Sequence, residues 1–221
     1  MRLFRSRAFA AGNASGFLLF AALLSALFFL AQFLQTARGH GPLDTGLRLL
    51  PWTATLFVVA PVAGALVNRL GERPFIAGGL LRQAVGMAWI GLIAAPDLAY
   101  ANLVAPLVVA GAGVSMAMPA AQNAVMGSVA PTALGKASGT FNTVRQLGGV
   151  FGITILVVVF AAAGSYASPQ AFSDGFAPAI GLAAALSLVG AAAGTALPGR
   201  RRATQPAPTD AVQEIKTWSG S

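Results

Sequence analysis

The chain has no cysteine, a single histidine and few charged residues. Asp, Glu, Lys and Arg together make up only 9% of its 221 residues. Disulfide frameworks, thiolate zinc sites and thiol catalysis are therefore excluded, and so is any chemistry that needs two imidazoles. A soluble domain carries about 25% charged residues, whereas 56% of this chain is hydrophobic. The composition predicts an integral membrane protein.

Long apolar runs fill most of the sequence. Because a helix needs roughly 20 mostly apolar residues to cross a bilayer, we expect six spans, at residues 9–34, 47–67, 75–95, 101–126, 137–163 and 176–197. Gly or Pro occurs in each break between them, at 39–42, 68–74, 96–97, 130–135 and 165–175. The first run is longer than a signal-peptide core, so we interpret it as a retained span. The sequence thus predicts an all-α integral membrane protein, a six-helix transmembrane bundle.

Basic residues are distributed unevenly around these spans. Alternating spans would place one set on a single side of the membrane: Arg2, Arg5, Arg7, Arg69, Arg73, Lys136, Arg200, Arg201 and Arg202. The other side has only Arg38 and Arg48. Because basic residues collect on the cytoplasmic side, we expect a multi-pass plasma-membrane protein with both termini in the cytoplasm. The net charge of +8 is then a topology signal, and no nucleic-acid motif accompanies it.

Three segments follow from this arrangement. Residues 1–8 form a basic cytoplasmic N terminus, and residues 9–197 form the transmembrane bundle. Residues 198–221 contain Pro206, Pro208 and many polar residues. A segment of that composition cannot bury enough apolar surface to fold, so we expect a disordered cytoplasmic tail.

The sequence offers no catalytic constellation. All six acidic residues fall in predicted breaks, at span ends or in the tail: Asp44, Glu72, Asp97, Asp174, Asp210 and Glu214. His40 lies in a predicted loop, and neither G-x-S-x-G nor H-E-x-x-H is present. We therefore expect neither an enzyme nor a metal or cofactor site. A proton relay usually needs a carboxylate or His inside a span, so the coupling ion of any transport stays open.

The fifth predicted span carries a stripe of small and polar residues. At 100° per residue its members fall within a wedge of roughly 120°: Gly135, Ser138, Asn142, Arg145, Gln146, Gly149 and Gly152. Small residues let helices approach closely and polar side chains bond across helices, so we expect this stripe to face away from lipid. The helix either lines the contact between two moving bundles or belongs to a static helix pair. A charge at mid-depth, on Arg145, is costly in lipid and favours the first interpretation.

Weaker candidates for a substrate cavity lie in two other spans. The fourth span has Met116, whose flexible side chain suits varied apolar ligands, and Gln122. The first span offers the aromatic Phe28 and the amide of Gln32. Ordinary packing is the alternative in both cases. In the third span, Arg82 is expected to extend its charge to the nearby surface.

Four stretches of the chain resemble one transporter family, and they follow one another in the same order as in that family. Residues 64–74 read GALVNRLGERP and resemble the G-x-x-x-D-x-x-G-x-R loop motif of the major facilitator superfamily. Residues 46–51, GLRLLP, resemble the entry to the matching helix in its fourteen-span drug:proton antiporters of the EmrB/QacA type. Residues 137–149, ASGTFNTVRQLGG, are similar to the A-S-G-x-x-N-T-x-R-Q-x-G-G signature near the end of those proteins, and residues 3–9 resemble the segment before their ninth span. The similarity extends to about Leu197.

The resemblance implies a bundle equivalent to the C-terminal half of a major facilitator fold, so we expect a C-terminal fragment of a longer transporter or a half-transporter. In such a half the first and fourth spans face a central cavity, the second and fifth flank the boundary with the other half, and the third and sixth lie outside. The implied activity is efflux of hydrophobic or amphipathic small molecules, including drugs, by alternating access. The lipid bilayer, the substrate and a missing N-terminal half or a second copy would be the partners.

The resemblance also assigns residues to sites. The cytoplasmic loop motif falls on Gly64, Asn68, Arg69, Gly71 and Arg73, with Asn68 standing where the motif has Asp. Contacts between helices or bundles are expected from Ser138, Asn142, Arg145, Gln146, Gly148, Gly149 and Gly152. The alternative to a transporter is a non-transporting membrane subunit, or an inactive remnant, that binds a partner helix bundle. Substrate identity and oligomeric state stay open.

Overall fold

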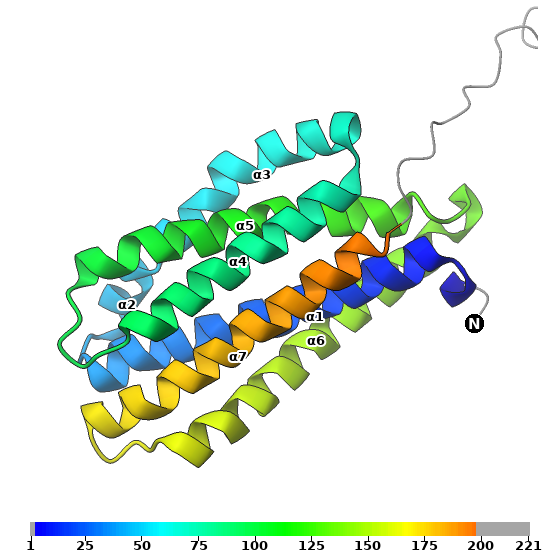
Figure 1. Ribbon diagram of the computed structural model, residues 1–221. Helices are drawn as coiled ribbons and strands as arrows, with labels where there is room; N and C mark the ends of the chain where they lie inside the picture. The colour runs from blue at the N-terminus through cyan, green and yellow to red at the C-terminus, as the bar shows by residue number, and fades with distance from the viewer. Residues whose placement is uncertain (1–2, 198–221) are drawn as a thin grey trace, which may run out of the picture.

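The computed structural model describes residues 3–197, which form helices joined by short turns without any β-strand (Figure 1). Its α-helices are α1 (Arg7–Gln32), α2 (Pro42–Arg48), α3 (Leu50–Leu70), α4 (Glu72–Ile93), α5 (Tyr100–Met126), α6 (Leu134–Ala163) and α7 (Pro169–Thr195). The 3₁₀ turn η1 (Leu3–Arg5) precedes α1, the π-helical η2 (Phe33–Ala37) continues α1, and the 3₁₀ turn η3 (Pro131–Ala133) leads into α6. The predicted tail at 198–221 lies outside the described residues.

Six helical segments of the described chain are long and apolar enough to cross a bilayer. They are α1 with η2, α2 with most of α3, α4, α5, η3 with α6, and α7. This confirms the prediction of an all-α protein built as a bundle of six apolar spans.

The predicted break at 165–175 is wrong in extent, because α7 begins at Pro169. The Ser168 hydroxyl caps the helix by accepting a hydrogen bond from the Ala171 backbone N–H at 3.1 Å. Proline at the first helical position loses no helical hydrogen bond. As a result Asp174, predicted in a loop, lies inside α7.

The predicted break at 68–74 is also too long. Helix α3 continues to Leu70 and α4 begins at Glu72, so only Gly71 separates them. Gly71 has a φ of 89°, a backbone conformation that residues with a Cβ rarely adopt. A single glycine therefore reverses the chain direction between two spans.

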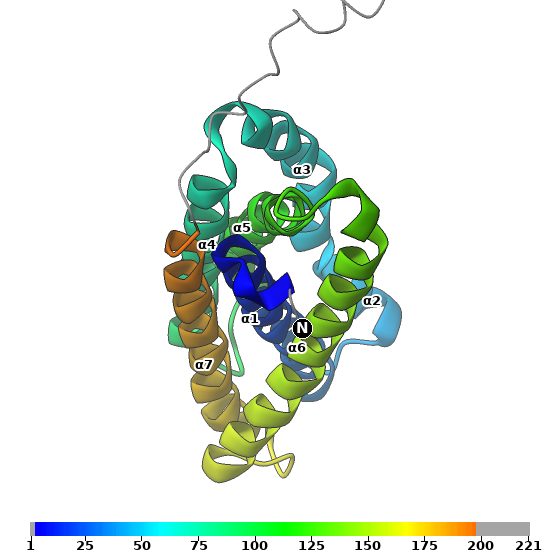
Figure 2. The ribbon, with the colours of Figure 1, turned by 90° about the vertical axis from the view of Figure 1, so that its right-hand side faces the viewer.

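The helices are arranged around α1 and α5 at the centre of the bundle (Figure 2). Helices α4 and α7 pack against each other on one side, α4 also against α5 and α7 also against α1. On the other side α3 packs mainly against α5, and α6 mainly against α1. These contacts leave α3 and α6 at the flanks.

The flanking helices are much less covered than the central ones. In the most apolar stretch of each span, 61% of α1 and 56% of α5 is buried, against 22% of α3 and 28% of α6. These are the second and fifth spans, which the family resemblance places at the boundary with another half.

Glycine contacts bring α4 and α5 close together. A Cβ on Gly79 would lie 2.6 Å from the carbonyl oxygen of Gly113, and one on Gly86 would lie 2.6 Å from the backbone nitrogen of Ala110. Real Cβ atoms do not approach backbone atoms so closely, so glycine is required at both positions. This small-residue packing is typical of helix pairs in membranes.

An aromatic cluster joins η2, α6 and α7 at the end of the bundle farthest from the N terminus. The rings of Phe33 and Phe176 stack with centroids 4.6 Å apart, and those of Phe160 and Phe172 are 4.9 Å apart. All four side chains are buried. Buried aromatic pairs contribute beyond their burial alone, so this cluster fixes one end of the bundle.

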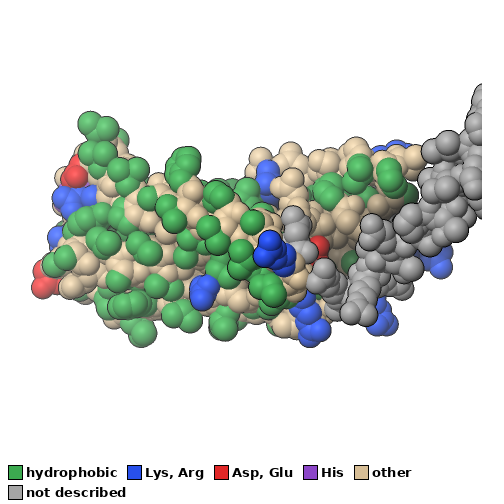
Figure 3. All heavy atoms as spheres, turned by 90° about the horizontal axis from the view of Figure 1, so that it is seen from above, with side chains coloured by type: hydrophobic (Ala, Val, Ile, Leu, Met, Phe, Trp, Pro, Cys, Tyr) green, Lys and Arg blue, Asp and Glu red, His purple; other side chains and the backbone are tan. Residues whose placement is uncertain are grey.

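The two ends of the bundle differ in charge, and we name them accordingly. The basic end, where α1 begins and α7 ends (Figure 1), includes Arg5, Arg7, Arg69, Arg73 and Lys136. The opposite end includes Arg38, His40, Asp44, Arg48 and Asp97. Between the ends, hydrophobic side chains cover much of the face seen in Figure 3.

Candidate functional site

Three glycines on α6 form the face that packs against α1. A Cβ on Gly148 would collide with the carbonyl oxygen of Phe17, and one on Gly152 with that of Ala21. A Cβ on Gly149 would collide with the side chain of Leu24. Gly148 and Gly152 are spaced as in the G-x-x-x-G pattern of close helix pairs. Gly149 and Gly152 belong to the predicted stripe and Gly148 borders it, so this part of the stripe forms a contact within the bundle.

The polar members of the stripe lie beside this glycine face and remain uncovered. Ser138, Asn142 and Gln146 are all exposed on α6. We call Asn142, Arg145 and Gln146 together the polar edge of α6. Polar side chains at this depth have no favourable contact with acyl chains, so the polar edge needs another surface or water beside it.

Arg145 lies at the junction of the glycine face and the polar edge. Its Nη2 donates a hydrogen bond to Oδ1 of Asn142 at 2.7 Å, and its Cζ lies 4.5 Å from the centre of the Phe20 ring. Its Nε is buried without a hydrogen-bond partner among residues 3–197. Phe20 belongs to α1, so the cation–π contact connects the two helices. Helix periodicity predicted Arg145 and Asn142 as members of one polar face. It could not predict the contact with Phe20, because periodicity does not pair residues of different helices.

The loop-motif residues are spread over the end of α3 and the start of α4. Gly64 lies inside α3 with no heavy atom near its missing Cβ, and Gly71 forms the sharp turn. Arg69 and Arg73 are exposed at the basic end. Asn68 lies within α3, but its side chain is outside the described residues. The motif therefore forms a helix–glycine–helix junction instead of a loop.

The four candidate substrate contacts do not come together. Phe28 and Gln32 lie toward the opposite end of α1, where Phe28 is 38% exposed. Gln122 follows Ala121 on α5, and the backbone of Ala121 packs against Gly12 of α1. Gly12 is about 24 Å from Phe28 along α1 at 1.5 Å per residue. These residues cannot line one compact site.

Met116 lies in a different place from the other candidates, beside an apolar pocket between α3, α4 and α5. The pocket has a volume of about 270 Å³ and is lined by Val58, Val59, Val62, Ala63, Leu66, Phe75 and Met116. Arg82 is exposed, and its Nη1 donates a hydrogen bond to Sδ of Met116 at 2.8 Å; that its charge extends to the membrane surface stays a prediction. The sequence did not reveal this pocket, because the α3 residues that line it are all apolar and give no polar signal.

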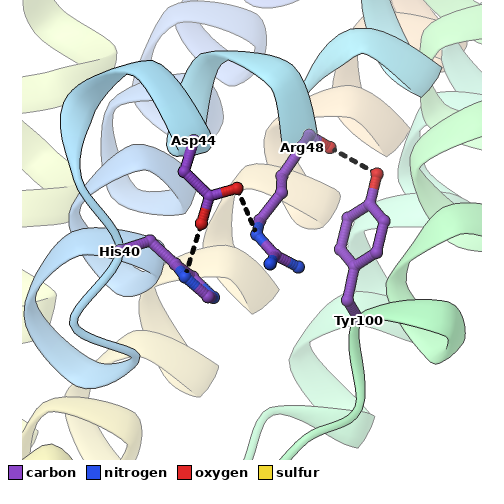
Figure 4. A network of polar contacts seen from close by, with 4 residues as sticks. All are labelled: His40, Asp44, Arg48 and Tyr100. Atoms are coloured by element: carbon purple, nitrogen blue, oxygen red, sulfur yellow. Dashed lines mark hydrogen bonds and ion pairs between the residues drawn. The ribbon is translucent and has the colours of Figure 1, made fainter.

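A polar cluster ties α2 to α5 at the opposite end (Figure 4). Asp44 accepts from Arg48 Nε at 3.0 Å and lies 2.7 Å from His40 Nδ1. The Tyr100 hydroxyl donates to the Arg48 backbone carbonyl at 3.1 Å, and the Arg48 guanidinium lies 4.8 Å from the Tyr100 ring centre. Both contacts of Asp44 join residues four apart in sequence, with His40 just before α2 and Arg48 at its last residue. The cluster fixes the connection between the first two spans.

Comparisons with known proteins agree with this architecture. The sequence profile of the Major Facilitator Superfamily matches residues 1–153. Multidrug resistance protein Stp of Mycobacterium tuberculosis is 33% identical over 162 residues, which are 73% of this chain and 30% of Stp. The tetracenomycin C resistance and export protein of Streptomyces glaucescens is 29% identical over 92% of this chain and 39% of its own length. The cephamycin export protein CmcT of Amycolatopsis lactamdurans is 30% identical over 88% of this chain and 40% of its own length.

The chain thus spans between 30% and 40% of the length of these relatives. The profile match covers more than half of the chain, and the six apolar spans agree with a multi-pass membrane protein. The family motifs, the helical architecture and the profile point to one assignment: this chain belongs to the major facilitator superfamily.

Proposed function

We propose that this chain forms one half of a drug or small-molecule efflux transporter in the plasma membrane. Its relatives are named for multidrug resistance or for export of tetracenomycin C and cephamycin. Its substrates are hydrophobic or amphipathic small molecules. Both termini lie in the cytoplasm, because the basic end holds Arg5, Arg7 and Lys136 and basic residues collect on that side.

One observation carries the proposal that the chain is a half. Helices α3 and α6 are the least covered of the six spans, and α6 exposes Asn142 and Gln146. Lipid tails cannot satisfy amide groups. A second six-helix bundle placed against α3 and α6 would cover both helices and leave the polar edge at the contact.

Transport would then proceed by rocking of one bundle against the other around a site near the middle of the membrane. Gly148 and Gly152 hold α6 tightly against α1, so the two helices move as one body. Asn142, Arg145 and Gln146 contact the other bundle or the substrate path. The sharp turn at Gly71 keeps the basic ends of α3 and α4 together during the movement.

The test compares accumulation of rhodamine 6G, an amphipathic dye, in cells that lack their own efflux pumps. One strain makes this chain alone, and a second makes it fused behind the N-terminal part of Stp. A third strain carries Arg145→Ala in the fusion. We expect the fusion to lower dye accumulation at least threefold, and the Arg145→Ala fusion to lose that effect.

Each outcome of this experiment identifies one arrangement. Lower accumulation with the chain alone indicates that a second copy completes the pathway. Lower accumulation only in the fusion indicates that an N-terminal half completes the pathway, either on the same longer chain or as a separate protein. Unchanged accumulation in every strain, with each protein present in the membrane, contradicts the proposal and favours a non-transporting subunit or an inactive remnant.

A further inference from the structure

Arg145 holds a positive charge deep inside the membrane-spanning part of α6. It lies about 5 Å from the midpoint of α6 at 1.5 Å per residue, whereas Lys136 lies at the basic end. A cation at this depth is expensive in hydrocarbon and usually marks a functional group with a partner. The question is which partner this chain provides.

The bundle satisfies only part of the Arg145 guanidinium. Of its five N–H donors, one bonds to Asn142, and the cation is stacked on the Phe20 ring. The Nε–H is buried and has no acceptor among residues 3–197. Because the Cζ of Arg145 lies over the Phe20 ring, another group can bind only at the N–H groups that face away from that ring.

The acidic residues of the described chain cannot supply a counter-ion. Asp44 and Asp97 lie at the opposite end, Glu72 begins α4, and Asp174 lies within the first two turns of α7. The carboxylate of Asp44 is already paired with His40 and Arg48. A second copy of the described bundle carries the same acidic residues at the same depths, so it offers no carboxylate at mid-membrane either.

The neighbours of Arg145 add donors instead of negative charge. Because Arg has no acceptor atom, the atom of Asn142 that faces it must be the oxygen, which leaves the Asn142 amide N–H groups free to donate. Gln146, the next residue, exposes a second amide on the same edge. A fork of guanidinium N–H groups with amide donors beside it matches a planar oxyanion.

We propose that the polar edge of α6 is a carboxylate-binding site inside the membrane, with Arg145 as the ligand-binding cation. The proposal rests on the proposed function, in which this edge faces a second bundle or a substrate path. The carboxylate comes either from an amphipathic small molecule or from a membrane helix that covers α6.

The experiment measures binding to the full chain in nanodiscs of neutral phosphatidylcholine. The first probe is laurate, with dodecanol as the uncharged equivalent. The second probe is a Leu-rich transmembrane peptide with one central Glu, with a central Gln as its neutral equivalent, and its binding is followed by energy transfer. The Arg145 Nε–H resonance, observed by 15N NMR, reports directly whether this group gains an acceptor.

We expect Arg145→Gln to weaken binding of laurate or of the Glu peptide at least tenfold, and the Nε–H resonance of the native chain to shift when that probe binds. The probe that responds identifies the source of the carboxylate. Arg145→Lys keeps the charge but loses the fork, so it should retain only part of the affinity. Arg82→Gln is the matched control, since it removes another arginine from within a span, and it should change affinity less than twofold.

Two results would overturn the proposal. The first is an equal loss in Arg145→Gln and Arg82→Gln, which would mean general attraction of anions to a basic chain. The second is that both probes bind Arg145→Gln as tightly as they bind the native chain, while a thermal melting curve shows that the variant is folded. Binding and efflux are separate readouts. If the fusion shows no efflux but the chain still binds carboxylate through Arg145, only the proposed function is contradicted.

Discussion

The glycine face and the polar edge of α6 are neighbours on one helix, but the bundle buries the glycines and leaves most of the polar edge exposed. Gly148 and Gly152 meet the backbone of α1 so closely that no side chain fits between them. One step around the helix, Asn142 and Gln146 are exposed, and Arg145 between them has a buried N–H without an acceptor in the described chain.

The difference teaches that the two parts of one sequence stripe have separate causes. The glycines are explained completely by a contact inside this bundle. The polar residues are not, because Asn142 and Gln146 are exposed and the buried Nε–H of Arg145 has no acceptor among residues 3–197. A stripe of small and polar residues therefore does not identify one interface. The small residues here pack against α1, and the polar residues are available to bind a partner or a ligand.

The largest expected effect comes from breaking the glycine face. Gly152→Leu would place a side chain against the Ala21 carbonyl, and backbone cannot move aside as a flexible side chain can. Overpacking of a core costs about 3 kcal/mol or more in severe cases. The unfolding free energy measured in bicelles should fall by about that amount. Gly139→Leu, on the same helix with no atom near its missing Cβ, should leave stability nearly unchanged, and an equal loss there would contradict the comparison.

Cysteine accessibility tests the polar edge directly, because the chain has no native cysteine. N-ethylmaleimide reacts with the thiolate, which forms readily in water and poorly in hydrocarbon. In the Stp fusion, Asn142→Cys should react about tenfold faster than Val158→Cys, since a thiolate is disfavoured in lipid. Val158 is 65% exposed on the same helix and apolar. Equal rates at the two positions would contradict a polar edge that water reaches.

The isolated chain should become more stable when the charge of the polar edge is removed. Arg145→Leu eliminates a buried N–H that lacks an acceptor in the described chain and still packs on Phe20. Leaving a buried donor unsatisfied costs about 1 kcal/mol or more, so the unfolding free energy in bicelles should rise by about 1 kcal/mol. Thr154→Val, an exposed change on the same helix, controls for general removal of a polar group. A marked loss of stability in Arg145→Leu would mean that the bundle already satisfies the charge.

The smallest effect is expected from Gln146 in the isolated chain. Gln146 is exposed, so Gln146→Leu should change the unfolding free energy by less than about 0.5 kcal/mol. Gln83 is the covered counterpart, because its amide is fully buried in α4 and unpaired among the described residues. Gln83→Leu should therefore stabilise by about 1 kcal/mol. Similar values for both variants would remove the distinction between covered and uncovered polar groups.

The sequence predicted the spans well and several of their ends poorly. Apolar length reports which segments lie in lipid, so all six spans were found. Gly175 was interpreted as part of a break, but it packs against Phe160 of α6, 2.8 Å from its missing Cβ. In membrane helices glycine often marks close packing instead of a break, and the true signal for the start of α7 was Ser168 followed by Pro169.

The candidate site was predicted in part, for a similar reason. Helix periodicity placed Asn142, Arg145 and Gln146 on one side of α6, because this depends only on spacing along one helix. Periodicity could not show that Phe20 of α1 stacks on Arg145. It also could not show that Phe28 and Gln122 lie at different depths, because that depends on how α1 and α5 run past each other.

The amino-acid sequence by itself determined that the chain is a membrane-embedded helical bundle with a polar stripe on its fifth span, because hydrophobic length and helical spacing are local properties. Only the tertiary structure decided which part of the stripe is covered. Gly148 and Gly152 are buried because α1 crosses α6 at those residues, whereas Asn142 and Gln146 fall just beyond that crossing. Helix crossing depends on the packing of all six spans together, and no single segment of sequence specifies it.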